Sequence, residues 1–138
     1  GIIHSEFNPS DKEPVHFLQI WIIPNMLDLR PSYEQKAFNR KSMTNRLTLL
    51  VSPDGHNGSL EIHQDAEIWQ ILLEENKDTE FAINHSRKIW IQVAEGSVST
   101  NEHLLVAGDG LAVSDEEDII RLRGIDKLSN IIIFNLRA

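Results

Sequence analysis

The segment Lys88-Ile89-Trp90-Ile91-Gln92-Val93-Ala94-Glu95-Gly96-Ser97-Val98 joins two patterns within a short length of chain. Ile89, Ile91 and Val93 alternate with Trp90 and Gln92, and such alternation is typical of a β-strand that lays one face on a core. Glu95-Gly96 interrupts the alternation, because glycine is a strong turn residue. The segment therefore predicts a strand, a turn and a second strand that begins at Ser97.

The same period of two recurs along most of the chain, with turn residues between the runs. Clusters of Pro, Asp, Asn and Gly lie at 52–58 and 108–110, and Arg123-Gly124 forms a further break. Many short, closely spaced strands predict an all-β sandwich or barrel, of which a double-sheet jelly roll is one form. The predicted strands are Val15–Ile23, Leu47–Val51, Ser59–His63, Ala66–Leu73, Glu80–Ile83, Lys88–Val93, Ser97–Thr100, His103–Val106, Gly110–Val113, Ile119–Leu122 and Asn130–Leu136.

The composition and charge of the chain limit the kinds of partner that it can bind. The chain has 138 residues, with 13 Lys and Arg against 21 Asp and Glu, for a formal net charge of -8. Both nucleic acids and anionic membranes repel an acidic surface, so direct binding to either is not expected. No apolar run is long enough to span a bilayer, and the absence of cysteine excludes thiolate chemistry. Without a secretory signal, a cytoplasmic location is the default expectation.

The first third of the chain differs from the rest. Both faces of the predicted strand Val15–Ile23 are largely apolar, so it needs cover on both sides, from the β domain, another copy or a part of the protein outside this sequence. Pro24 ends it, and residues 24–45 show no clear period and resemble a linker, apart from a short helical turn after Pro31. We therefore divide the chain into an arm (1–23), a connector (24–45) and a β domain (46–138).

The opening residues Gly1-Ile2-Ile3-His4-Ser5-Glu6-Phe7-Asn8-Pro9-Ser10 contain the main candidate site. In an extended segment, His4 and Glu6 point to the same face. An imidazole beside a carboxylate can hold a divalent transition metal, although this spacing is more often a surface pair.

Longer strings carry a family resemblance. GIIHSEFNPS, PVHFLQIWIIP and PSYEQKAF, followed by SPDGHNGSLEIHQDAEIW and KIWIQVAEGSV, are similar in order and content to pirin-family proteins, including bacterial pirin-like quercetinases. The resemblance covers essentially the whole chain. Pirins contain two cupin barrels, so it implies a cupin-type double-stranded β-helix for 46–138, with 1–23 as the last strands of a truncated N-terminal cupin.

The resemblance also implies a metal. In pirins the ion lies in the first cupin, bound by two His of an early His-x-His and by a later His and Glu, which His4 and Glu6 match. The spacing from His4 to Asn8 fits the second cupin motif. No His-x-His occurs here. The resemblance therefore implies the C-terminal part of a longer protein whose intact form holds Fe, Ni, Cu, Mn or Co, and a weak or empty site in this chain.

The second barrel departs from the metal-binding cupin pattern. If Gly96 is the motif glycine, three ligand positions fall on Ile83, His85 and Ile89, and the second motif places the fourth on Leu111. Aliphatic side chains fill a barrel interior and do not bind cations. We expect a packed or apolar-lined second barrel without metal, and a loop role for His85.

Other chemically suggestive residues have structural interpretations. His56 and His63 are expected in a turn or on a strand face, although His63 beside Asp65 could act in acid–base chemistry. His16 is expected to be buried in the arm, or else to support the metal site. Trp21, Trp69 and Trp90 are expected in the core, although they could stack on a flavonoid. The acidic run 115–118 is expected to be a solvated turn, and Gly108–Gly110 a tight β-turn.

Three classes of function follow. The resemblance implies that the intact protein is a metal-dependent quercetin (flavonol) dioxygenase, with His4 and Glu6 as ligands and Glu6 also as the base, whereas this chain alone is inactive. The alternative is a non-enzymatic regulatory or protein-binding module, because pirins are also associated with protein partners and metal-redox sensing. A purely structural second cupin is a third. For the chain itself, we expect a homodimer through the exposed arm.

Overall fold

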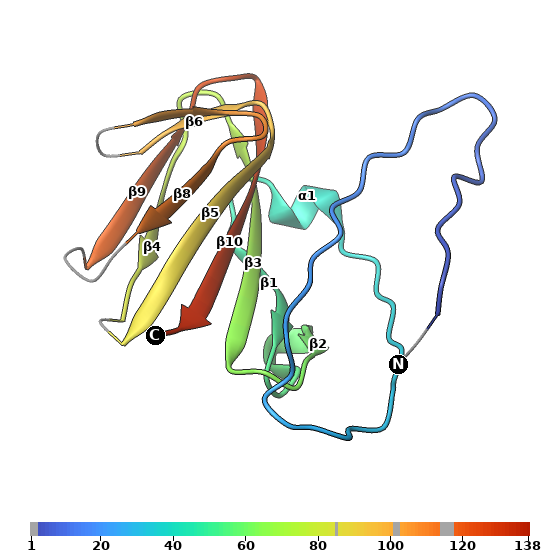
Figure 1. The fold of residues 1–138 in the computed structure, drawn as a ribbon. Coiled ribbons are helices and arrows are strands. Elements are labelled where there is room, and N and C mark those ends of the chain that lie inside the picture. Colours follow the sequence, from blue (N-terminus) through green and yellow to red (C-terminus); the bar gives the residue numbers. More distant parts are fainter. Residues whose placement is uncertain (1–2, 85, 101–102, 114–117) are drawn as a thin grey trace.

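The computed structural model describes residues 3–84, 86–100, 103–113 and 118–138. Two sheets carry nearly all of the regular structure (Figure 1). In spatial order, the six-stranded sheet contains β2 (Leu60–Glu61), β1 (Thr48–Ser52), β3 (Ala66–Glu74), β10 (Leu128–Arg137), β5 (Arg87–Glu95) and β8 (Gly110–Val113). The four-stranded sheet contains β4 (Asp78–Ala82), β9 (Ile119–Gly124), β6 (Ser97–Ser99) and β7 (Leu104–Val106).

From β3 onward the chain passes repeatedly from one sheet to the other. β3, β5, β8 and β10 lie in the larger sheet, and β4, β6, β7 and β9 in the smaller one. All pairings among these strands are antiparallel, whereas the short β2 pairs in parallel with β1. This alternation makes a jelly roll, so the all-β, cupin-type double-stranded β-helix predicted from the sequence is confirmed.

The core lies between the two sheets and follows from the alternation of each strand. It consists of aliphatic side chains with one phenylalanine, and Leu47, Trp69, Leu111 and Val113 pack against its edge. Its members are Ile71, Leu73, Phe81, Ile83, Ile89, Ile91, Val93, Val98, Leu105, Ile120, Leu122, Ile131 and Ile133.

Gly96 forms one of the corners at which the chain changes sheets. Its φ is +75°, and a Cβ there would lie 2.7 Å from the Ser129 side-chain oxygen and 2.9 Å from the Leu128 carbonyl oxygen. The buried Ser129 hydroxyl donates to the Ser97 carbonyl at 2.6 Å and accepts from the Ser97 N–H at 3.1 Å. A glycine is therefore needed where β5 turns into β6.

The predicted strands of the β domain are confirmed, with ends that differ by a few residues; the largest change is at Ser59–His63, where the strand is only Leu60–Glu61. The strand predicted at Val15–Ile23 is wrong, because this segment has no hydrogen-bonded neighbour strand among the described residues. The helical turn after Pro31 is also absent. A helix, α1, instead spans Arg40–Met43, and Asn39 caps it by accepting from the Lys41 N–H at 2.9 Å.

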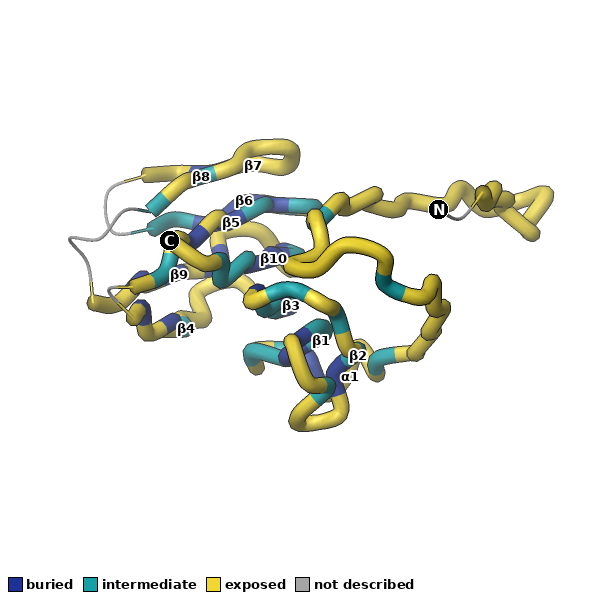
Figure 2. The backbone as a smooth tube through the Cα atoms, turned by 60° about the horizontal axis from the view of Figure 1, so that its bottom comes forward, coloured by how far each residue is buried: buried dark blue, intermediate teal, exposed yellow. Residues whose placement is uncertain are grey.

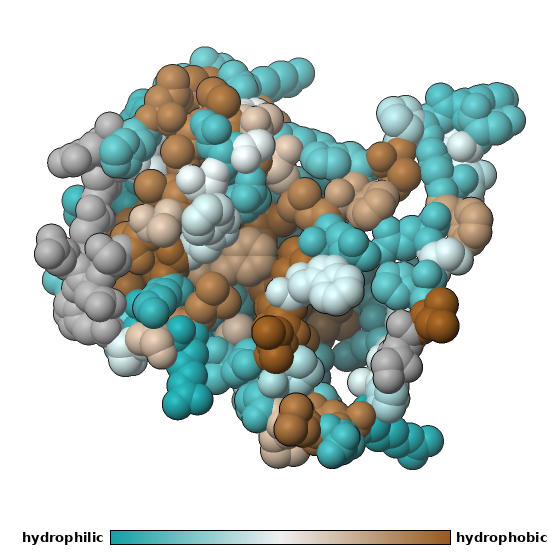
Figure 3. Space-filling model, viewed as in Figure 1, coloured by the Kyte–Doolittle hydropathy of each residue, from teal (hydrophilic) through white to brown (hydrophobic). Residues whose placement is uncertain are grey.

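Residues 18–22 of the arm lie against the outer face of the six-stranded sheet, whereas the part of the arm before them runs away from the sheets (Figure 2). The Ile23 carbonyl oxygen accepts from the Gln64 side chain at 2.7 Å, and the Asn25 N–H donates to the His63 carbonyl oxygen at 2.8 Å. Leu18, Ile20 and Ile22 alternate with the more exposed Phe17, Trp21 and Ile23. Figure 3 shows apolar surface beside the arm. The arm therefore keeps the alternating pattern of a strand, but only one of its two apolar faces is covered.

No helix among the described residues is long and apolar enough to cross a membrane. α1 has only four residues. It contacts β3, and Thr44 forms a parallel bridge with Leu72.

Candidate functional site

His4 and Glu6 lie close together near the start of the chain. Their segment is extended, and His4 Nε2 is 3.7 Å from Glu6 Oε1. Both side chains are about half exposed, at 58% and 46%. The extended backbone thus places the imidazole and the carboxylate on the same side, as alternation requires.

The pair lines an open cavity of about 540 Å³. The other walls are residues 18–24, which are mostly apolar and include Trp21 and Pro24. The site therefore combines one nitrogen ligand, one oxygen ligand and an apolar wall.

The donor set suits a divalent transition metal in type but not in number. Imidazole nitrogen and carboxylate oxygen are both common ligands of such ions. Within the described part of the chain, however, no group of three or more His, Asp or Glu side chains is arranged to hold a metal. His4 and Glu6 can therefore form only part of a metal site.

Three of the four positions at which the sequence pattern would place cupin ligands hold aliphatic side chains in or beside the core. Ile83 and Ile89 belong to the buried core, and Leu111 packs against it. The fourth position, His85, lies outside the described residues. This part of the fold is thus packed rather than open to a ligand.

The other histidines have separate partners. His16 was expected to be buried, and this is wrong: it is exposed, with Nδ1 3.3 Å from Glu95 Oε1. His63 does not pair with Asp65, whose carboxylate instead forms an ion pair with Arg87 at 2.5 Å. The structure therefore gives His63 no carboxylate partner for acid–base chemistry among the described residues.

His56 begins the short 3-10 turn His56–Gly58 and pairs with Asp54, with 2.5 Å between Nδ1 and Oδ1. The hydrogen bond from the His56 side chain lowers the pKa of Asp54 below its ordinary value, with help from the His56 backbone N–H and Ser52. Ser52 in turn contacts the buried Ser59 at 2.7 Å. This network fixes the turn, as predicted, and none of its residues lines the cavity of His4 and Glu6.

The three tryptophans differ in environment. Trp69 packs on the core and meets the Phe81 ring edge-on at 6.0 Å between centroids. Trp90 is 41% exposed on the outer face of β5, and Trp21 is 85% exposed. The core position expected for Trp90 and Trp21 is wrong. Trp90 lies on the face of β5 opposite the buried Ile89 and Ile91, and Trp21 belongs to a segment without a paired strand among the described residues.

The Gly108–Gly110 turn is confirmed. Asp109 accepts a hydrogen bond from the Val106 N–H at 2.9 Å, and Gly108 has a φ of +94°. Of the acidic run 115–118, only Asp118 lies within the described residues.

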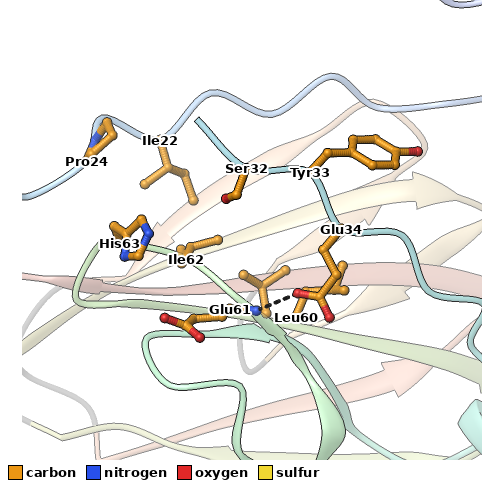
Figure 4. A pocket seen from close by; sticks show the side chains of 10 residues that line it. Ile22, Pro24, Ser32, Tyr33, Glu34, Leu60, Glu61, Ile62 and His63 are labelled. Carbon is orange, nitrogen blue, oxygen red and sulfur yellow. Dashed lines mark hydrogen bonds between the residues drawn. The ribbon is translucent and has the colours of Figure 1, made fainter. Parts of the chain in front are cut away.

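A second cavity of about 630 Å³ lies between the arm, the connector and β2 (Figure 4). Glu34 accepts from the Glu61 N–H at 3.4 Å, and the carboxylates of Glu34 and Glu61 point in different directions (Figure 4). The Tyr33 hydroxyl donates to Gln35 at 2.7 Å. The carboxylates do not converge on one point, so this cavity forms no metal site.

Comparison with known proteins places these features in a family. The profile of the quercetinase C-terminal cupin domain matches residues 49–136. A quercetin 2,3-dioxygenase of Escherichia coli strain K12 is 38% identical over 136 residues, which is 99% of this chain and 57% of that protein. This chain thus spans little more than half the length of that relative.

Solved structures agree. The bacterial pirin YhhW from Escherichia coli, crystallised with nickel(II), superimposes with a TM-score of 0.77 and 32% identity, over 85% of this chain and 48% of that one. A quercetin 2,3-dioxygenase from Acinetobacter baumannii is similar in fold alone, with a TM-score of 0.52 and 14% identity over 66% of this chain and 32% of that one.

The matched profile includes both sheets and the packed barrel interior between them. The chain therefore belongs to the pirins, as a quercetinase-type C-terminal cupin domain.

Proposed function

We propose that this chain is the C-terminal part of a two-cupin protein that acts as a metal-dependent flavonol dioxygenase. The observation that carries the proposal is the 3.7 Å approach of His4 and Glu6 in a chain of the quercetinase family. The 38% identical relative is named a quercetin 2,3-dioxygenase, and the similar pirin YhhW was crystallised with nickel(II).

His4 and Glu6 are proposed as two ligands of the intact site, with the other two on the part of the protein before residue 1. The division into an arm (1–23) from the first cupin, a connector (24–45) and a C-terminal cupin (46–138) belongs to the same proposal. A bound divalent ion, whether Fe, Ni, Cu, Mn or Co, would polarise the oxygens of a flavonol.

Glu6 is also proposed as the base. Its carboxylate oxygen would accept the proton of the flavonol hydroxyl, and the half-exposed position of its side chain leaves it accessible to a substrate. The apolar wall of residues 18–24 would contact the flat rings and exclude water. Because two ligands hold a divalent ion weakly, we expect the 138-residue chain alone to be inactive.

The test uses the full-length protein and its Glu6→Gln variant. We expect oxygen consumption with quercetin to fall by about a hundredfold or more, as for loss of a general base, and metal content per chain to fall as well. The matched control is Glu13→Gln, an exposed carboxylate in the same segment that does not line the cavity. Unchanged turnover and metal content in Glu6→Gln would remove Glu6 from the site.

The same measurements separate the enzyme from the alternative, a regulatory or protein-binding module. A full-length protein that retains one metal ion per chain through His4 and Glu6 but consumes no oxygen with quercetin would contradict the dioxygenase and favour the module.

A further inference from the structure

A third cavity of about 650 Å³ opens beside α1, away from the arm. The connector, α1, β1 and the 3-10 turn His56–Gly58 form its walls, and Trp69 of β3 closes one side. Its size is that of a site for one small organic molecule. The lining residues are Lys36, Ala37, Phe38, Asn39, Ser42, Arg46, Leu47, Thr48, Leu49, Asn57, Gly58 and Trp69.

The charge of this cavity is opposite to that of the molecule. Its lining includes Lys36 and Arg46 but no Asp or Glu, although acidic residues outnumber basic ones by 21 to 13 in the chain. Residues 36–46 also contain Arg40 and Lys41 and no acidic residue. Concentrated positive charge in an acidic protein favours an anion at this position.

The Arg46 guanidinium carries N–H groups that can donate hydrogen bonds to a ligand. Its guanidinium makes no hydrogen bond or ion pair within the described residues, and it is exposed at the cavity. The Lys36 ammonium contacts the Gly58 carbonyl oxygen and lies 5.4 Å from the centroid of the Phe38 ring. Those contacts hold Lys36 in place beside the cavity. A guanidinium can bind a carboxylate or phosphate through two parallel hydrogen bonds.

Part of the lining is apolar. Trp69 lines the cavity together with Phe38, Leu47 and Leu49. The Trp69 indole is held in place: its N–H donates to Glu67 at 2.9 Å, and its ring packs on the core, where it meets Phe81. The carboxylate oxygen of Glu67 that accepts from Trp69 also accepts from Asn135 at 3.0 Å. A rigid aromatic face is a suitable surface for a flat ring.

We propose that this cavity binds a small aromatic anion, a ring that bears one carboxylate or phosphate group. The ring would lie against Trp69, and the anionic group would accept hydrogen bonds from Arg46 with Lys36 nearby. This site is separate from His4 and Glu6, which line a different cavity.

The test titrates the 138-residue chain with 4-hydroxybenzoate and with phenyl phosphate, and follows the three indole N–H signals by ¹⁵N NMR. We expect saturable shifts of the Trp69 signal at lower probe concentration than any shift of Trp21 or Trp90, which line other cavities and therefore report binding elsewhere. The two probes distinguish a carboxylate ligand from a phosphate ligand. 4-Hydroxybenzamide has the same ring without the charge and should bind at least about tenfold more weakly, as expected for loss of a charge-assisted hydrogen bond.

Arg46→Gln should weaken binding of the anionic probe by about tenfold for the same reason. The matched control is Arg40→Gln, which makes the same charge change in the same segment but does not line the cavity. Lys36→Gln is a second variant with the same expected direction. The proposal is overturned if Arg40→Gln weakens binding as much as Arg46→Gln, if the benzamide binds as well as the benzoate, if inorganic phosphate matches phenyl phosphate, or if no saturable shift occurs.

Discussion

Gly124 is a residue at which the fold accepts no side chain. A Cβ there would overlap the carbonyl oxygen of Glu74, and its own N–H and carbonyl oxygen bond to Lys77 and Asn76 at 2.9 Å. Because the obstacle is backbone, we expect Gly124→Ala to lower the free energy of unfolding by about 3 kcal/mol, measured by urea denaturation.

The comparison for that prediction is Gly108→Ala. Gly108 has a φ of +94°, but a Cβ there would meet nothing within 4 Å. Its cost is therefore backbone strain alone, about 1 kcal/mol. Equal losses in the two variants would show that the close approach at Glu74 is unimportant.

Asp54 gives the chain an acid-sensitive contact. Its pKa is held below the ordinary 3.8 chiefly by the hydrogen bond from His56. The native state therefore binds a proton less readily than the unfolded state, and this stabilisation is complete above the ordinary value and lost as the pH falls through the lowered pKa. We expect His56→Gln to raise the pKa of Asp54, as measured by NMR titration. A pKa that does not change in this variant would exclude His56 as the cause.

At the scale of single residues, the features that could be predicted from the sequence are those set by neighbouring positions in the chain. The buried aliphatic residues Ile83 and Ile89 and the tight turn at Asp109 could be predicted because alternation and turn residues act over a few positions. The exposure of Trp21 could not, since both faces of residues 15–23 are apolar, whereas Trp90 shares its face with Lys88 and Gln92 and its exposure follows from the alternation of that strand. Arg46, which has no side-chain partner among the described residues, and Trp69 line one cavity that only the tertiary fold brings together.

Among the elements, α1 is anchored by its last residue. Met43 is 3% exposed and Met26 is 60% exposed. We expect Met43→Ala to lower the free energy of unfolding by about 2 kcal/mol or more and Met26→Ala to change it by less than about 0.5 kcal/mol, both measured by urea denaturation. A small effect at Met43 would mean that α1 does not contribute to the core.

The connector and the arm were harder to predict than the β domain. The reasons can be seen in α1 and in residues 15–23. α1 is too short to produce a helical period, and its position depends on contacts with Leu72 and Glu74 of β3. Residues 15–23 have the alternation of a strand, but a strand also needs a neighbour to accept its backbone hydrogen bonds. The alternation of residues 15–23 therefore predicted which side chains share a face. It could not predict whether another strand pairs with this segment.

For the whole molecule, the outward row of the arm remains uncovered. Phe17, Trp21 and Ile23 are exposed, whereas the buried apolar residues of the described chain begin at Met43. We propose that two copies associate through this row, because exposed apolar surface of this kind favours association. Sedimentation should show a mass that rises with protein concentration.

The variant that tests self-association is Trp21→Ser, which should keep the chain monomeric. Its fold should not change, because Trp21 is 85% exposed. A wild-type chain that stays monomeric at high concentration, or a Trp21→Ser chain that associates as strongly as the wild type, would contradict the arm-mediated dimer.

The packing of Ile83, Ile89 and Leu111 also limits how the second barrel could change. An engineer who wished to install a second catalytic ion there would have to exchange several branched aliphatic residues together. Each intermediate protein would bury a polar group with neither water nor cation to satisfy it, at a cost of about 1–3 kcal/mol for a neutral imidazole and far more for an ionised carboxylate. New chemistry in this half of the protein is therefore more accessible on its outer surface than in its centre.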